Sequence, residues 1–219
     1  IININASPFH KGKSAIRERM LSRRARENGV IVSYTNMVGG QDEIVFDGNS
    51  LLVDKRGRVM ARAKAFEEDL LIADLAFESS TFRQHTRDVV ASRQLTSRYP
   101  LKKLIANRFQ NNKTKKTIKS EMVTKIDPLE EVYLALVTGV RDYVRKNHFA
   151  RVVIGISGGI DSALTAAIAV DALGADNVTG VLMPSVFTSK ESREDSRVLT
   201  KVLGCSLLTI KISGVWKQY

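Results

Sequence analysis

Six consecutive residues combine the small and polar side chains that phosphate binding requires: Ser157-Gly158-Gly159-Ile160-Asp161-Ser162. Glycines let a backbone approach a ligand closely, and the free N–H groups of a following helix attract anions. A carboxylate such as Asp161 repels phosphate unless it holds Mg²⁺ that is bound to that phosphate. The segment therefore predicts a phosphate site with Mg²⁺ at Asp161, although an ordinary tight strand-to-helix turn can have the same composition.

Two common nucleotide-binding patterns are missing from this segment. It has no Gly-x-x-x-x-Gly-Lys-Ser/Thr sequence, so no lysine is placed to reach a phosphate as it does in P-loop enzymes. It also lacks Gly-x-Gly-x-x-Gly, the pattern of dinucleotide-binding turns, which disfavours a dehydrogenase.

The elements around the segment alternate between helix and strand. An amphipathic helix is expected from Asp127-Pro128 to about Asn147, and a near-continuous apolar strand over 151–156. The expected elements that follow are helix 162–173, strand 178–183, helix 191–203 and strand 207–212. This order predicts a doubly wound parallel α/β sheet, with the glycine turn at the end of its first strand.

The N-terminal segment alternates over shorter distances. Strands are expected at 1–5, 30–34 and 70–75, and a hairpin over 50–61. An Arg-rich helix is expected to begin after an N-cap at Ser14 and to run to about Asn28. Residues 39–42, Gly-Gly-Gln-Asp, have the composition of a turn.

A basic stretch lies between these two segments. From Glu78 to Lys125 there are 12 Lys and Arg residues against three acids, so +9 of the net charge of +11 falls there. One helix is expected over 101–109. Because aromatic residues do not interleave with the charges, a solvated linker is favoured over a nucleic-acid arm. The predicted division is 1–78, 79–126 and 127–219.

Composition excludes several other classes. One cysteine, Cys205, allows no internal disulfide and favours a cytoplasmic setting. Three scattered histidines show no zinc-ligand spacing. No apolar run approaches the roughly 20 residues of a membrane-spanning helix, so no membrane is expected.

The segment 157–162 matches the Ser-Gly-Gly-x-Asp-Ser loop of the ATP-pyrophosphatase synthetases. Together with residues 127–133, 155–172 and 180–185, it resembles glutamine-dependent NAD synthetase. The resemblance implies ATP and Mg²⁺ as cofactors, with Asp161 as the Mg²⁺ ligand and with the adenine near the strand that ends at Met183. The ATP-binding residues that it implies are Gly155, Ile156, Ser157, Gly158, Gly159, Ile160, Asp161, Ser162 and Met183.

Residues 5–13, 39–43 and 46–50 resemble the latter half of the nitrilase-like glutaminase domain of the same family. The resemblance implies part of an αββα sandwich, in which Ser7 and Lys13 hold glutamine. A serine can hydrogen-bond an amino-acid headgroup, and a lysine can pair with its carboxylate.

The resemblance places the glutaminase cysteine, glutamate and lysine upstream of Ile1, so no catalytic residue is expected within this chain. Cys205 is expected to be a small core residue instead. An internal fragment of a longer enzyme, inactive alone, is therefore expected; the alternative is a diverged chain that has lost both catalytic ends.

The implied reaction converts deamido-NAD to NAD with ammonia from glutamine, through an adenylated intermediate that releases pyrophosphate and AMP. The expected partners are ATP, deamido-NAD and glutamine, within a homo-oligomer. Two alternative functions remain open. One is another ATP-pyrophosphatase enzyme, such as GMP synthetase or a tRNA-thiolating enzyme. The other is a non-catalytic module that binds nucleic acid through residues 79–125.

Overall fold

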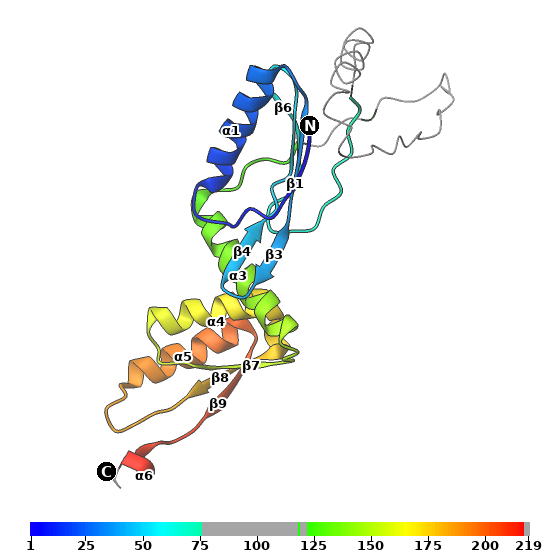
Figure 1. The fold of residues 1–219 in the computed structure, drawn as a ribbon. Coiled ribbons are helices and arrows are strands. Elements are labelled where there is room, and N and C mark those ends of the chain that lie inside the picture. The colour runs from blue at the N-terminus through cyan, green and yellow to red at the C-terminus, as the bar shows by residue number, and fades with distance from the viewer. Residues whose placement is uncertain (76–117, 119–121, 217–219) are drawn as a thin grey trace. The chain divides into compact units, whose positions relative to one another are not determined.

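The computed structural model describes residues 1–75, 118 and 122–216 (Figure 1). It divides into two compact units, Ile1–Leu71 with Met122–Tyr219, and Ile72–Glu121, and all elements named below belong to the first. The helices are α1 (Lys13–Asn28), α3 (Pro128–Lys146), α4 (Ile160–Leu173), α5 (Lys190–Leu203) and α6 (Ser213–Trp216), with a 3₁₀ turn at Ala175–Asn177. The strands are β1 (Ile2–Asn5), β2 (Val32–Asn36), β3 (Val38–Gln41), β4 (Ile44–Asp47), β5 (Leu51–Val53), β6 (Val59–Arg62), β7 (Val152–Gly155), β8 (Val178–Leu182) and β9 (Ser206–Thr209).

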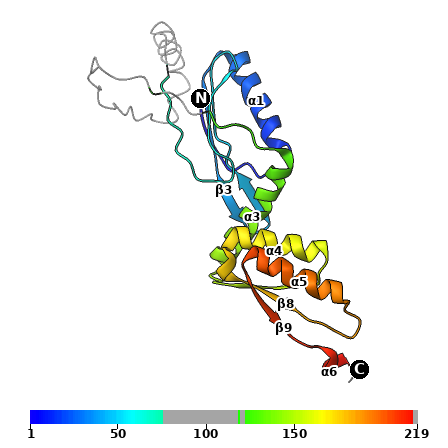
Figure 2. The ribbon, with the colours of Figure 1, turned by 180° about the vertical axis from the view of Figure 1, so that it is seen from behind.

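The N-terminal segment forms a mixed four-stranded sheet in the order β1-β2-β5-β6. Strands β1 and β2 are parallel, and the other neighbours are antiparallel. Helix α1 lies along this sheet in both ribbon views (Figures 1 and 2). Its apolar stripe closes one core with the strands, made of Leu21, Ala25, Val32, Tyr34, Leu51 and Val53.

A separate antiparallel hairpin, β3–β4, contacts helix α3. The turn predicted over 39–42 is shifted toward the C-terminus: Gly39 and Gly40 belong to β3, and the chain turns at Asp42 and Glu43. A Cβ atom on Gly39 would lie 2.8 Å from Oδ2 of Asp142 on α3. Gly39 also has φ of +125°, a conformation that favours glycine, so both its backbone and the nearby carboxylate of α3 disfavour a side chain here.

The C-terminal segment forms a parallel sheet in the order β7-β8-β9. Helices α4 and α5 contact each other and lie on one side of this sheet (Figure 1). Helix α3 packs against α4 as well as against the β3–β4 hairpin. The α/β class and the parallel sheet are thus confirmed.

Several predicted boundaries differ from the structure. Helix α1 begins at Lys13 with Gly12 as its N-cap, so the prediction of an N-cap at Ser14 was wrong. Residues 70–75 form no strand, because an apolar run becomes a strand only where a partner strand satisfies its backbone, and none pairs with it in the described part of the chain. Helix α4 begins at Ile160, two residues earlier than expected. The helix predicted over 101–109 lies outside the described residues.

The division of the sequence at residues 78 and 126 stays a prediction. Within residues 1–75, 118 and 122–216, no helix is both long and apolar enough to cross a membrane.

Candidate functional site

The glycine turn between β7 and α4 rests on the start of helix α5. Gly158 has φ of +83°, and a Cβ atom there would lie 2.5 Å from the backbone oxygen of Ser192. The N-terminus of α5 is itself capped by Ser189, whose Oγ accepts from the Ser192 amide at 3.0 Å. Both the conformation and the space at Gly158 therefore exclude a side chain. The sequence predicted the glycine, but not its contact with the next helix.

The amides of the turn divide into two groups. Ser157 N donates to Ser162 Oγ and Gly159 N donates to Ser157 Oγ, both at 3.2 Å. Among the described residues, the amides of Gly158, Ile160, Asp161 and Ser162 have no hydrogen-bond partner. Unpaired amides at a helix start form an anion site, and the positive end of the helix dipole strengthens it. The turn therefore keeps four backbone donors available for a phosphate group.

The two hydroxyls of the turn are positioned by the turn itself. Ser157 Oγ and Ser162 Oγ are 3.1 Å apart, and Ser162 Oγ donates to the carbonyl of Gly159 at 2.9 Å. A hydroxyl rotates readily, so each can redirect its proton toward a bound phosphate. The amides of Ser157 and Gly159 stay engaged, because the hydroxyl oxygens still accept from them.

Asp161 fits a magnesium site that is completed by phosphates. Its side chain is exposed in the first turn of α4, next to the unpaired amides. Mg²⁺ is usually held by one or two carboxylates together with substrate phosphates and water. Within the described residues no group of three or more His, Cys, Asp or Glu could hold a metal ion. A magnesium site here would therefore need nucleotide phosphates and water to supply most of its ligands.

The remaining predicted ATP-binding residues lie at the adjoining strand ends. Met183 follows β8, and its Cε is 3.6 Å from the position that a Cβ atom on Gly155 would occupy. Met183 is 49% exposed and Ile160 is 80% exposed, so both are open to a ligand. Ile156 differs: its side chain is 3% exposed, and its amide donates to Val181 O at 2.9 Å. Ile156 can therefore contact a ligand through its backbone, but its buried side chain leaves little surface for one.

The loop after β8 is held by Arg193, which is not among the predicted site residues. Arg193 Nη2 donates to the carbonyls of Ser185 and Thr188, at 3.1 and 3.0 Å. An arginine four residues after a serine N-cap carries no recognisable signal of this role. It fixes the segment that leads from Met183 back to α5.

The two predicted glutamine-binding residues lie in the segment between β1 and the start of α1. Ser7 is half-buried, and its amide donates to Asn36 Oδ1 at 2.8 Å. Lys13 is half-buried, and its Nζ donates to Pro8 O at 2.7 Å. An ammonium has three donors, so Lys13 can pair with a carboxylate while it keeps this bond. The Ser7 hydroxyl and the Lys13 ammonium are thus presented by one short, anchored segment.

A buried ion pair supports that segment. Arg17 Nη2 lies 2.9 Å from Asp47 Oδ1, and the two residues are 4% and 0% exposed. Asn36 Nδ2 donates to the same Asp47 oxygen at 3.4 Å. Asn36 therefore connects the ion pair to the Ser7 amide. Arg17 was missed because an arginine in an Arg-rich helix gives no sign that it is buried.

Cys205 has the environment expected of a packing residue. It is half-buried after α5, and its amide donates to Thr200 O at 3.1 Å. Burial raises the pKa of its thiol, which disfavours the reactive thiolate form.

Comparisons with known proteins match both segments. The carbon-nitrogen hydrolase family model matches residues 1–82, and the NAD synthase family model matches residues 132–219. Glutamine-dependent NAD(+) synthetases from Thermotoga maritima and Aquifex aeolicus are 46% and 43% identical to the whole chain. The chain spans 38% of the length of each of these relatives.

A solved structure agrees with the sequence comparisons. It is the glutamine-dependent NAD+ synthetase from Acinetobacter baumannii in complex with ADP, which is 32% identical with a TM-score of 0.75. The match covers 99% of this chain and 35% of that one. With the two family models, these alignments show that the chain belongs to the glutamine-dependent NAD(+) synthetase family.

Proposed function

We propose that the full-length protein amidates deamido-NAD to NAD, using ATP and ammonia released from glutamine. The observation that carries this proposal is the set of unpaired amides at Gly158, Ile160, Asp161 and Ser162, in the turn before α4 and in its first residues. The Acinetobacter baumannii relative is a complex with ADP, which supports an adenine nucleotide as a ligand of this protein. Because the chain spans 38% of its relatives' length, the activity is proposed for the whole protein.

The turn acts by position and charge. Its amides and the Ser157 and Ser162 hydroxyls would bind the β and γ phosphates of ATP, while Met183 lies beside the base. When the nicotinate carboxylate attacks the α phosphorus, the bond to the β phosphate breaks and negative charge grows on the departing pyrophosphate. Fixed amide donors stabilise that charge without reorganising. Ammonia then attacks the adenylated carboxyl carbon, and AMP leaves.

The Ser7–Lys13 segment would supply glutamine to this reaction. Lys13 is placed to pair with the glutamine carboxylate, and Ser7 is placed to hydrogen-bond its headgroup. The nucleophile that releases ammonia is expected upstream of Ile1. We further propose that the protein is a homo-oligomer.

The experiment is to incubate the full-length protein with Mg-ATP and to measure pyrophosphate with and without deamido-NAD. Release that requires deamido-NAD, with NAD formed from either glutamine or ammonia, supports the proposal. Pyrophosphate release that ignores deamido-NAD would favour a related ATP-pyrophosphatase with another acceptor. Salt-sensitive RNA binding without ATP binding would favour the nucleic-acid module.

Asp161→Asn tests the magnesium ligand. Mg²⁺ bound at this carboxylate would neutralise phosphate charge, so we expect adenylation to fall by on the order of 100-fold or more, with glutamine hydrolysis largely intact. Asp176→Asn is the matched control, because Asp176 is also exposed and lies at the other end of α4. Near-normal NAD formation by Asp161→Asn would remove Asp161 from this role.

A further inference from the structure

A carboxylate from the C-terminal segment reaches the candidate glutamine-binding segment. Oε2 of Glu131, in the first turn of α3, accepts a hydrogen bond from the Gly12 amide at 3.2 Å. Glu131 is 6% exposed, whereas its neighbour Glu130 is exposed. Burying a carboxylate costs free energy unless it is hydrogen-bonded, so this contact is a defined one and not a solvated side chain near a surface.

The Gly12 contact replaces a missing part of the helix cap. Gly12 is the N-cap of α1, in a left-handed conformation, and has no side chain to cap the helix. In a capping box the amide of the N-cap residue is bound by a Glu or Gln three residues later, and that position holds Ala15. Glu131 provides the acceptor instead, and its negative charge also suits the positive end of the α1 dipole.

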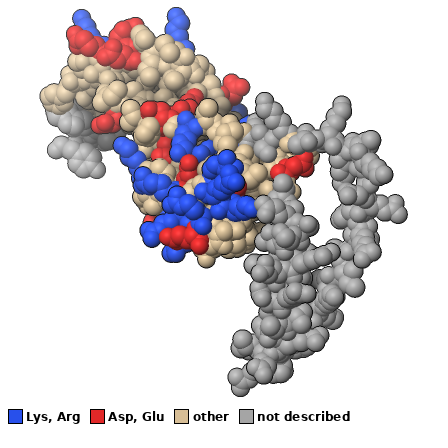
Figure 3. Space-filling model, turned by 90° about the horizontal axis from the view of Figure 1, so that it is seen from above, with Lys and Arg blue, Asp and Glu red and all other residues tan. Residues whose placement is uncertain are grey.

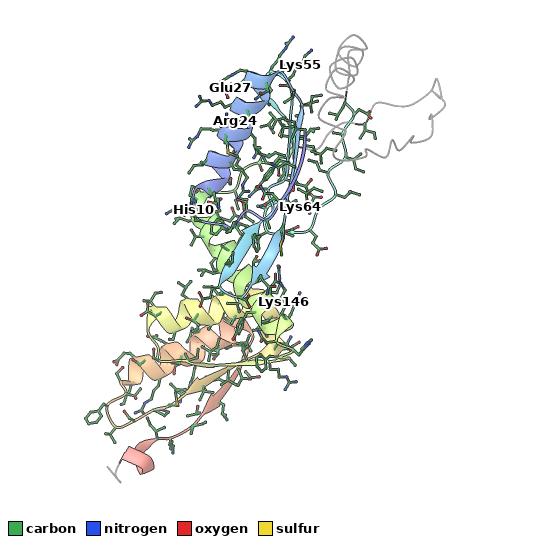
Figure 4. All side chains as sticks on the ribbon, viewed as in Figure 1. His10, Arg24, Glu27, Lys55, Lys64 and Lys146 are labelled. Carbon is green, nitrogen blue, oxygen red and sulfur yellow. The ribbon has the colours of Figure 1, made fainter. Side chains whose placement is uncertain are left out.

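The rest of this segment is held by hydrogen bonds to other residues of the N-terminal part of the chain. The Ser7 amide is held by Asn36, and the Phe9 amide donates to Val45 O at 2.7 Å. The Lys13 amide donates to His10 O at 3.0 Å, and Figure 4 shows His10 close to the start of α1. Glu131 is thus the side chain that ties residues 7–13 to α3, and it does so at the residue before Lys13.

Helix α3 is itself fixed on two sides. Toward the β3–β4 hairpin, Asp142 Oδ2 accepts from the Gly40 amide at 2.7 Å, and Lys146 Nζ donates to Gly40 O (Figure 4). Toward α4, the Tyr133 hydroxyl donates to Asp171 Oδ2 at 2.7 Å. Glu131 therefore projects from a helix with little freedom to move, which is what a positioning side chain needs.

We propose that Glu131 is a positioning residue of the glutamine site. By holding Gly12, it fixes the first turn of α1 and so directs the Lys13 ammonium toward the glutamine carboxylate. The inference rests on the proposed function, and it assigns part of the amidase site to a helix of the synthetase segment.

The test uses four variants of the full-length enzyme. Glu131→Ala removes the acceptor, Glu131→Asp shortens it by one methylene, and Glu131→Gln keeps an acceptor oxygen at the same reach. Glu130→Ala removes the same charge from the same helical turn without touching Gly12. For each variant, glutamine hydrolysis gives KM and kcat for glutamine, and NAD formation with ammonium chloride reports the synthetase half.

We expect KM for glutamine to rise on the order of tenfold in Glu131→Ala and Glu131→Asp, with kcat within about twofold, since the contact affects binding and not the nucleophile. Glu131→Gln should stay near the parent KM, and Glu130→Ala should match the parent. Ammonia-dependent NAD formation should be unchanged in all four, which also shows that they are folded.

Three results would overturn the inference while leaving the proposed function intact. They are an unchanged KM in both Glu131→Ala and Glu131→Asp, a Glu131→Gln variant as impaired as Glu131→Ala, or an equal defect in Glu130→Ala. If Glu131→Ala does not fold, Glu131→Asp and Glu131→Gln still decide between the outcomes. A parent protein that makes NAD from neither glutamine nor ammonia would instead overturn the proposed function itself.

Discussion

Gly158 is subject to two separate constraints, and the chain offers a residue that shares only one of them. Gly158 and Gly174 have φ of +83° and +86°. A Cβ atom on Gly158 would lie 2.5 Å from Ser192 O, whereas one on Gly174 would meet nothing within 4 Å. A comparison of the two positions therefore separates backbone strain from the packing of the turn on α5.

We expect Gly158→Ala to destabilise the protein more than Gly174→Ala does. Both pay about 1–3 kcal/mol for the backbone conformation, and Gly158→Ala adds about 1–3 kcal/mol for the clash with Ser192. Because the turn must move to relieve that clash, ATP binding should also weaken, but in this variant only. Urea denaturation and calorimetric titration with Mg-ATP measure the two effects. Equal losses at both positions would mean that contact with α5 does not set the shape of the turn.

At the scale of elements, the buried ion pair between Arg17 and Asp47 joins α1 to β4. Removing one member of a buried pair leaves the other charged and unpaired, which costs about 3–5 kcal/mol. We therefore expect Arg17→Met to lower the free energy of unfolding by about that amount. Arg19→Met is the control, since Arg19 is exposed on the same helix, and it should change stability by less than about 0.5 kcal/mol. Similar urea midpoints for the two variants would contradict this account.

The stabilisation from the hydrogen bond between Tyr133 on α3 and Asp171 on α4 depends on pH. The hydrogen bond to Asp171, with burial and the charge of that carboxylate adding to it, raises the pKa of Tyr133 from 10.0 to about 12. Because the folded-state pKa is the higher one, the stabilisation is complete below about pH 10 and is lost as the pH rises through about 12.

Tyr133→Phe should accordingly cost about 0.5–1 kcal/mol at neutral pH, and its difference from the parent should vanish near pH 12. Tyr143→Phe is a suitable control, because Tyr143 lies on the same helix and is 57% exposed. The measurement is thermal unfolding of both variants as a function of pH. A Tyr133→Phe difference that persists above pH 12 would assign the effect to packing and not to the hydroxyl.

The sequence predicted the C-terminal elements better than the N-terminal ones, for a physical reason. Strand β7 is a continuous apolar run, and helices α4 and α5 are followed by the C-cap glycines Gly174 and Gly204, so their signals are local. The β3–β4 hairpin was missed because its glycines fit around Asp142, a partner about a hundred residues along the chain. No local pattern records such a partner.

The same distinction divides the candidate site. The turn over 157–162 could be predicted because its glycines, hydroxyls and carboxylate are consecutive. Ser192, Arg193 and Glu131 could not, since each acts on a segment that folding brings to it. Residue type gives no sign that Glu131 is buried while Glu130 is exposed; that difference follows from the face of α3 that packs inward.

At the scale of the whole molecule, charge complicates any test of nucleotide binding. The net charge is +11, of which +9 falls within Glu78 to Lys125. Lys and Arg side chains also gather on the face shown in Figure 3. Figure 4 places two basic residues, Arg24 and Lys55, near Glu27 at the C-terminal end of α1. Such a surface attracts any polyanion through long-range forces that salt screens. Binding of ATP alone therefore does not identify the turn before α4.

A thermal-shift comparison separates ATP binding at the turn before α4 from general attraction of polyanions to the basic surface. A ligand that binds the folded state at about 100 times its Kd adds about 2.7 kcal/mol, which is roughly 5–10 °C in Tm. We expect Mg-ATP to reach this shift, and Mg-tripolyphosphate at the same concentration to give less, because it lacks a base to contact the strand ends near Met183.

Raising sodium chloride from about 0.05 to about 0.5 M shortens the reach of surface charge. It should therefore remove most of the tripolyphosphate shift and leave most of the ATP shift. Gly158→Ala serves as the reference, since it keeps every charge of the parent and should lose the ATP-specific part alone. Equal shifts from the two ligands at both salt concentrations would indicate that the basic surface, and not the turn, binds the nucleotide.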